Sequence, residues 1–101
     1  MHENQKTIND WSIKTFGPVK NMQKSIDRMV EEVNELQDQA EVDIDDFDKI
    51  SNECADILIT LYQVATTFGF DLHACVDHKM QINRARKWKL NGDGTGQHIK
   101  E

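Results

Sequence analysis

Apolar residues recur at helical spacing along most of this chain, which predicts four helices. Between residues 21 and 40 they follow steps of three and four residues, the spacing of one face of an amphipathic helix: Met22, Ile26, Met29, Val30, Val33, Leu36 and Ala40. Shorter helices are expected at residues 7–15 and 72–88. No segment alternates convincingly as a strand would, so the predicted fold class is all-α, as a single domain over residues 1–101.

The remaining helix, residues 47–68, is apolar around most of its circumference and ends at Gly69. A helix of this kind is normally buried at the centre of its assembly. It carries one polar line, made of Glu53, Asp56, Thr60, Gln63 and Thr67. Burying carboxylates on such a line is costly unless another group compensates them.

Acidic side chains form two clusters that suit a divalent cation. Residues three apart lie on one face of a helix, so Glu32 pairs with Glu35 on the second helix and Glu53 pairs with Asp56 on the third. If the pairs face each other, they form the hard-oxygen environment that Mg²⁺ or Mn²⁺ prefers. Glutamates on a single helix are usually a solvated surface. The second pair, Glu53 and Asp56, lies on a largely apolar helix, and this favours a metal site.

The charge is distributed unevenly. Residues 1–78 contain 16 acidic and 6 basic side chains, whereas residues 79–101 contain 2 acidic and 6 basic ones. The acidic body argues against nucleic acid as a partner, and a basic end suits a ligand that carries phosphates. Simple solubility charge is the alternative.

No apolar run approaches a membrane span, and the start lacks a signal peptide's pattern. With Cys54 and Cys75 expected to be buried and reduced, this indicates a cytoplasmic protein.

Three further features are candidates for substrate binding. Lys79, Asn83 and Arg86 continue an apolar line of the fourth helix, which favours an anionic ligand next to the core; a protruding, solvated helix end is the alternative. The Gly-rich tail, residues 91–101, could close over phosphates but does not match the phosphate-loop pattern. Aromatic side chains such as Trp11 could stack on a base, although in small helical domains they more often belong to the core.

The motifs resemble those of a known family. Glu31-Glu32-x-x-Glu35 and Glu53-x-x-Asp56, with 17 residues between them, are similar to the EExxE…ExxD signature of the MazG-like all-α nucleoside triphosphate pyrophosphohydrolases. Lys79-x-x-x-Asn83 also fits. The segments around Trp11 and Phe16-Gly17-Pro18, and around Arg86-x-Trp88 and Gly96-Gln97-His98, resemble compact phage-type members that act on purine deoxynucleotides.

The resemblance implies Mg²⁺-dependent cleavage of a (d)NTP, with dGTP or dATP favoured, to the monophosphate and pyrophosphate. Mn²⁺ would substitute, with two or more ions per site. It makes Glu32, Glu35, Glu53 and Asp56 the metal ligands and Glu31 the residue that orients or deprotonates the attacking water. The substrate-binding residues would be Lys79, Asn83, Arg86, His98 and Trp11. It also implies a dimer or a dimer of dimers, and a role in shaping or cleansing the dNTP pool.

Two alternatives stay open at this point. A phosphoribosyl-ATP pyrophosphohydrolase shares the acidic motif and reaction type. A non-enzymatic helical interaction module would use the same acids only as surface charge. The preference for purines rests on the resemblance alone, because no residue is identified as reading a purine edge.

Overall fold

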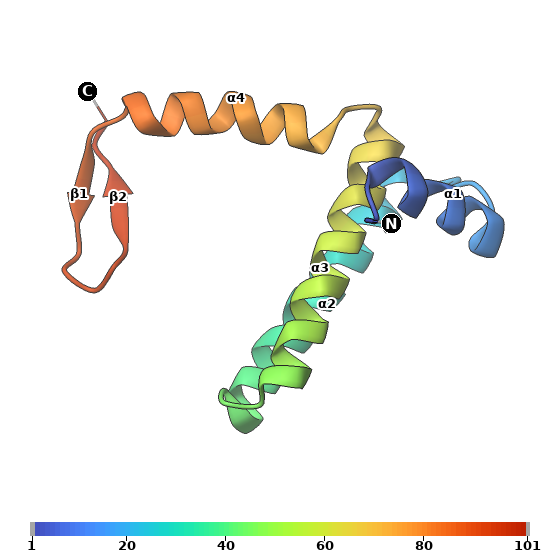
Figure 1. The fold of residues 1–101 in the computed structure, drawn as a ribbon, viewed down its shortest axis with the longest axis horizontal. Helices are drawn as coiled ribbons and strands as arrows, with labels where there is room; N and C mark the ends of the chain where they lie inside the picture. Colours follow the sequence, from blue (N-terminus) through green and yellow to red (C-terminus); the bar gives the residue numbers. More distant parts are fainter. Residues whose placement is uncertain (1, 101) are drawn as a thin grey trace.

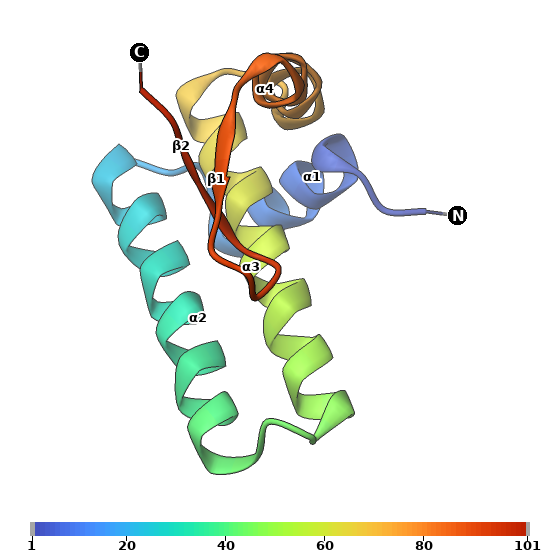
Figure 2. The same cartoon turned by 90° about the vertical axis from the view of Figure 1, so that its left-hand side faces the viewer.

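A computed structural model describes residues 2–100 as four helices followed by a short hairpin. The elements are α1 (Gln5–Phe16), α2 (Met22–Asp43), α3 (Phe47–Phe68), α4 (Leu72–Ala85), β1 (Trp88–Leu90) and β2 (Gly96–His98). Helices α2 and α3 run antiparallel side by side, and α1 packs against α3 (Figures 1 and 2). Helix α4 leaves the end of α3 as an arm that carries the hairpin away from the body (Figure 1).

The helix ends follow from local chemistry. Asn21, Asp46 and Asp71 precede α2, α3 and α4, and each side chain accepts a hydrogen bond from a backbone N–H of the first turn, which satisfies a donor that has no partner inside the helix. Helix α3 ends at Gly69, whose φ of 84° lies in the left-handed region where glycine is favoured. The predicted bounds of α3 are therefore confirmed.

The turn between α3 and α4 is braced by side chains. Gln5 of α1 donates from Nε2 to the carbonyl oxygen of Phe70 at 2.8 Å, and its Oε1 accepts from the N–H of Leu72 at 2.9 Å. The hydroxyl of Tyr62 lies 2.6 Å from Nε2 of His73. These bonds hold the first turn of α4 against α1 and α3, so the arm leaves the body in a defined direction.

The expectation of no strand was wrong for the tail, although the chain is mostly helical as predicted. Strands β1 and β2 pair antiparallel, with Trp88 opposite His98 and Leu90 opposite Gly96. Helix α4 ends at Ala85 instead of residue 88 because Arg86 is extended, with ψ of 155°. Strands of three residues are too short to show an alternating pattern. The glycines of the turn between them led to the interpretation of this segment as a Gly-rich tail.

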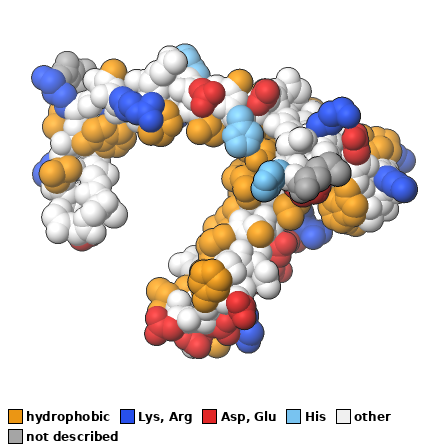
Figure 3. Space-filling model, in the orientation of Figure 1, with side chains coloured by type: hydrophobic (Ala, Val, Ile, Leu, Met, Phe, Trp, Pro, Cys, Tyr) orange, Lys and Arg blue, Asp and Glu red, His pale blue; other side chains and the backbone are white. Residues whose placement is uncertain are grey.

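The single chain buries little of its apolar surface. On α3 the buried residues are Thr60, Tyr62 and Ala65, whereas Leu58 and Phe68 are 46% and 44% exposed. The prediction that α3 is buried on all sides is therefore wrong for one chain, and both cysteines, expected to be buried, are exposed. Hydrophobic side chains gather on the concave side between α4, the hairpin and α3 (Figure 3).

Candidate metal centre

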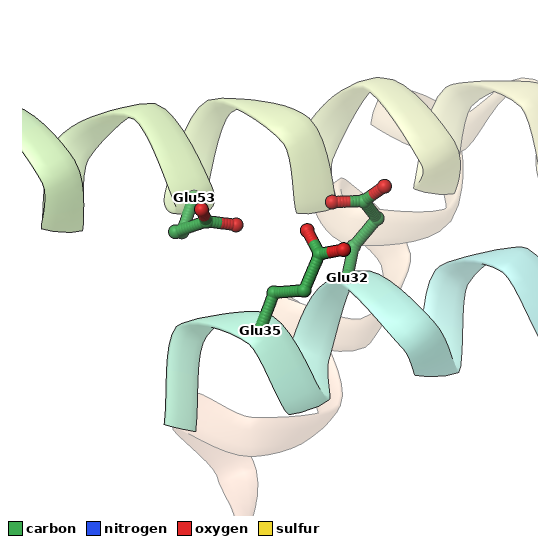
Figure 4. Close-up of side chains that lie close together, drawn as sticks. All are labelled: Glu32, Glu35 and Glu53. Atoms are coloured by element: carbon green, nitrogen blue, oxygen red, sulfur yellow. The ribbon is translucent and has the colours of Figure 1, made fainter. Parts of the chain in front are cut away.

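Three of the four predicted ligands meet between α2 and α3. One oxygen each from Glu32, Glu35 and Glu53 lie within 4.8 Å of one another. Glu32 and Glu35 extend from neighbouring turns of α2, and Glu53 approaches from α3 (Figure 4). Oxygens at this mutual spacing can share one or more hard cations. The structure therefore brings together three members of the predicted four-carboxylate set, and Asp56 is not among the converging oxygens.

Burial leaves two of these oxygens without a partner. Glu32 is only 7% exposed. Its Oε2 and the Oε2 of Glu53 are buried without a hydrogen bond, while Nε of Arg28 lies 3.3 Å from the other Glu32 oxygen. A buried carboxylate oxygen without a partner is costly. The donor set and its unpaired oxygens therefore fit a divalent cation.

The electrostatics of Glu32 support this fit. Burial raises the pKa of its carboxyl, the neighbouring carboxyl of Glu35 and the charge of Asp56 raise it further, and Arg28 opposes them. The carboxylate form is thus disfavoured by its surroundings. A divalent cation reverses this effect because it neutralises the clustered charge.

Asp56 lies beside the cluster, in a pocket of about 180 Å³ that we call the three-helix pocket. Residues from α1, α2 and α3 line it: Trp11, Phe16, Arg28, Glu32, Asp56, Ile59, Thr60 and Gln63. The pocket joins the acidic cluster to an aromatic wall, since the rings of Trp11 and Phe16 stand edge to face with centroids 5.5 Å apart. Trp11 thus lines the same pocket as Glu32 and Asp56, and its role in substrate binding stays a prediction.

Glu31 is exposed and lies outside the group of converging oxygens. Glu31 therefore neighbours the cluster only along the sequence, and its catalytic role stays a prediction. Arg28 and Gln63 are pocket residues to which the sequence analysis gave no role. The spacing of Arg28 four residues before Glu32 could have revealed the ion pair.

The predicted phosphate contacts on the arm do not reach the acidic cluster of their own chain. Lys79 is exposed, and Asn83 and Arg86 are half-buried near the hairpin. The carbonyl oxygen of Asn83 accepts from the indole N–H of Trp88 at 2.9 Å, and the ring of His98 lies 6.0 Å from that of Trp88. The line of Lys79, Asn83 and Arg86 therefore belongs to an arm that projects away from the body of its own chain (Figure 1).

Comparison with known proteins decides the family. Residues 4–101 match the family model described as dATP/dGTP pyrophosphohydrolase. The chain belongs to this family. It is therefore an enzyme of the MazG-like pyrophosphohydrolase group and not a non-enzymatic interaction module.

Two phage proteins named dATP/dGTP diphosphohydrolase are similar in sequence. The one from Salmonella phage PMBT28 is 34% identical over 95 residues, although the chain spans only 30% of its length. The one from cyanophage S-2L is 32% identical over 99 residues, which cover 96% of this chain and 86% of that protein.

A solved structure shares the fold of this family member. It is a cyanophage S-2L MazG-like pyrophosphohydrolase bound to dGDP and three catalytic Mn²⁺ ions per active site. The TM-score is 0.72 at 30% identity, over 95% of this chain and 93% of that chain. That protein holds metal in its active site, as expected here from the acidic clusters.

Among residues 2–100, no helix combines the length and apolarity needed to cross a membrane.

Proposed function

We propose that this chain hydrolyses dATP and dGTP, between the α and β phosphates, to the monophosphate and pyrophosphate in a metal-dependent reaction. The observation that carries the proposal is the acidic cluster with its two unpaired buried oxygens, which opens into a pocket with an aromatic wall. A role in shaping or cleansing the dNTP pool follows from such an activity. The expected place of action is the cytoplasm, that of the host for a phage-encoded enzyme.

Glu32, Glu35, Glu53 and Asp56 would hold the metal, Mg²⁺ or Mn²⁺, as two or more ions per site. Bound ions of this kind acidify a water molecule, polarise phosphoryl oxygens and offset the charge of leaving pyrophosphate. The remaining work of the protein is positioning, because phosphoryl transfer needs alignment and charge stabilisation more than a covalent nucleophile.

Different residues of the chain contact different parts of the substrate in this proposal. Glu31, exposed and adjacent to Glu32, orients or deprotonates the attacking water. Trp11 is 52% exposed and lines the three-helix pocket, so its ring offers a face to the nucleobase. Arg28 balances part of the negative charge at Glu32. From this order of acids and aromatic wall we infer that the triphosphate lies over α2 and α3 and the base against α1.

The reaction is tested by its products and by the position of an oxygen label. With dGTP or dATP and Mg²⁺ in ¹⁸O-water, we expect the label in the monophosphate and none in pyrophosphate, because water attacks the α phosphorus. Mass spectrometry of both products measures this. Label confined to pyrophosphate would show attack at the β phosphorus and would contradict the proposed reaction.

Lys79, Asn83, Arg86 and His98 are proposed to serve the acidic site of a second copy. They lie in residues 79–101, the outer part of the arm, which carry 6 basic and 2 acidic side chains, whereas residues 1–78 carry 16 acidic and 6 basic ones. The arm is therefore complementary in charge to the body of another chain. The Gly-rich end of the same arm, residues 91–101, would close over the phosphates there. The apolar concave side offers the surface for this contact (Figure 3).

Self-association to a dimer or tetramer is the measurable consequence. Val76 and Met80 are 48% and 38% exposed on one side of α4, and soluble monomers seldom leave large contiguous apolar patches uncovered. Light scattering at micromolar concentration should show at least a dimer, and Val76→Asp should shift it toward monomer. His78→Asp adds the same charge at another exposed position of α4 and should not. A compact, active wild-type monomer would contradict this proposal.

A further inference from the structure

One amide side chain lines the three-helix pocket, and within residues 2–100 only one of its two polar atoms makes a hydrogen bond. Gln63 of α3 donates from Nε2 to Oγ of Ser12 on α1 at 2.8 Å. Among the residues that the structure describes, its other polar atom, Oε1, has no hydrogen bond. Gln63 is half-buried in the wall that also holds Trp11 and Phe16. An amide with a spare acceptor beside two aromatic rings is suited to read a planar, polar ligand edge.

Its position along α3 matches the far end of a nucleotide bound at the acids. Asp56 and Gln63 line the same pocket and are separated by seven residues, or about 10 Å along the helix axis. A substrate whose phosphates lie at Glu32 and Asp56 therefore points its base toward Gln63. Thr60, between them, donates its hydroxyl to the backbone of Ile57 at 2.8 Å, so its one proton is already used.

The two purines present opposite hydrogen-bonding patterns at that end. Adenine offers a donor at its six-amino group and an acceptor at N1, whereas guanine offers an acceptor at O6 and a donor at N1. An amide matches either pattern because rotating it by half a turn exchanges its oxygen and its NH₂. The Ser12 hydroxyl can donate or accept, so it remains bonded to Gln63 after the rotation.

We propose that Gln63, held by Ser12, reads the base edge and admits both adenine and guanine by rotating its amide. The inference rests on the proposed function and names the specificity device of the same site. Pyrimidines, whose single ring ends closer to the sugar, fall short of Gln63. The same geometry thus predicts acceptance of the two purines and discrimination against pyrimidines.

The test compares kcat/KM for dATP and dGTP in wild type and in Gln63→Glu. A carboxylate only accepts hydrogen bonds, so at position six it keeps the contact with the amino group of adenine and repels O6 of guanine. We expect the ratio of the two kcat/KM values to change by about 10-fold or more, the size of one lost base contact. Gln37→Glu adds the same charge at an exposed position of α2 and should leave the ratio unchanged. An unchanged ratio in a folded Gln63→Glu enzyme would overturn the proposal.

A second measurement needs only the wild-type protein. The deoxynucleoside triphosphate of unsubstituted purine lacks any group at position six. We expect its kcat/KM to be about 10-fold below that of dATP, and equal rates would overturn the role of Gln63. If wild type cleaves no purine dNTP, the proposed function itself fails. If it cleaves them but neither comparison shows a difference, only the inference about Gln63 fails.

Discussion

Replacing Asp56 by Asn should remove nearly all turnover while the helices still form. The amide has almost the same shape as the carboxylate but no charge, so one predicted metal ligand is lost and the fold keeps its packing. We expect kcat to fall by more than about 100-fold, since even residues behind a ligand cost about 10–100-fold when mutated. Steady-state kinetics with Mg²⁺ and with Mn²⁺ measure this.

Thermal unfolding gives an independent reading of the same variant. In chelator, Asp56→Asn should be at least as stable as wild type, because one of the charges that disfavour ionised Glu32 is removed. Added Mn²⁺ should raise the midpoint of wild type more than that of the variant. Asp45→Asn, in the exposed connection between α2 and α3, is the matched control and should behave as wild type. Full activity of Asp56→Asn without divalent metal would show that the acids are not a metal site.

Loss of Lys79 should weaken catalysis without weakening metal binding. Lys79→Ala leaves all four carboxylates intact and removes a cation that faces the triphosphate in the proposed assembly. We expect kcat/KM to fall by about 10–100-fold, the size of one charge-assisted contact of about 1.5–3 kcal/mol. If the contact of Lys79 with the phosphates strengthens as pyrophosphate leaves, its loss lowers kcat as well. If Lys79 stabilises the bound ground state and the transition state equally, its loss raises KM alone.

Mixing variants tests whether Lys79 acts on the neighbouring chain. Lys79→Ala and Asp56→Asn chains, combined and allowed to exchange, restore one intact site per mixed dimer if the lysine is supplied by the partner. Random mixing then yields about one quarter of wild-type activity. Lys24→Ala, at an exposed position of α2, should have no effect alone. If the mixture is no more active than its components, Lys79 does not act across the interface.

The sequence predicts most of this fold because its strongest signals are local. The helical spacing of apolar residues and the capping residues Asp46, Asp71 and Gly69 suffice to place α3 and the start of α4. The acidic pairs of α2 and α3 were also predictable, since spacing within a helix fixes which side chains share a face.

What the sequence does not show depends on contacts between distant segments. The bond between Gln63 and Ser12 spans 51 positions, and no pattern in either helix indicates it. The direction of the arm depends on Gln5, which contacts the turn after α3 from another helix. The hairpin was missed because strands of three residues carry too few positions to show a period.

The bracing of the turn between α3 and α4 has a kinetic meaning. Gln5, Tyr62 and His73 fix the direction of the arm within one chain, so little conformational freedom is left to lose in the proposed association of two copies. An arm that is already oriented can dock without a preceding rearrangement, which is the condition for ordinary rather than slow association rates. Weakening the brace should therefore slow the encounter of chains before it alters the surfaces that meet.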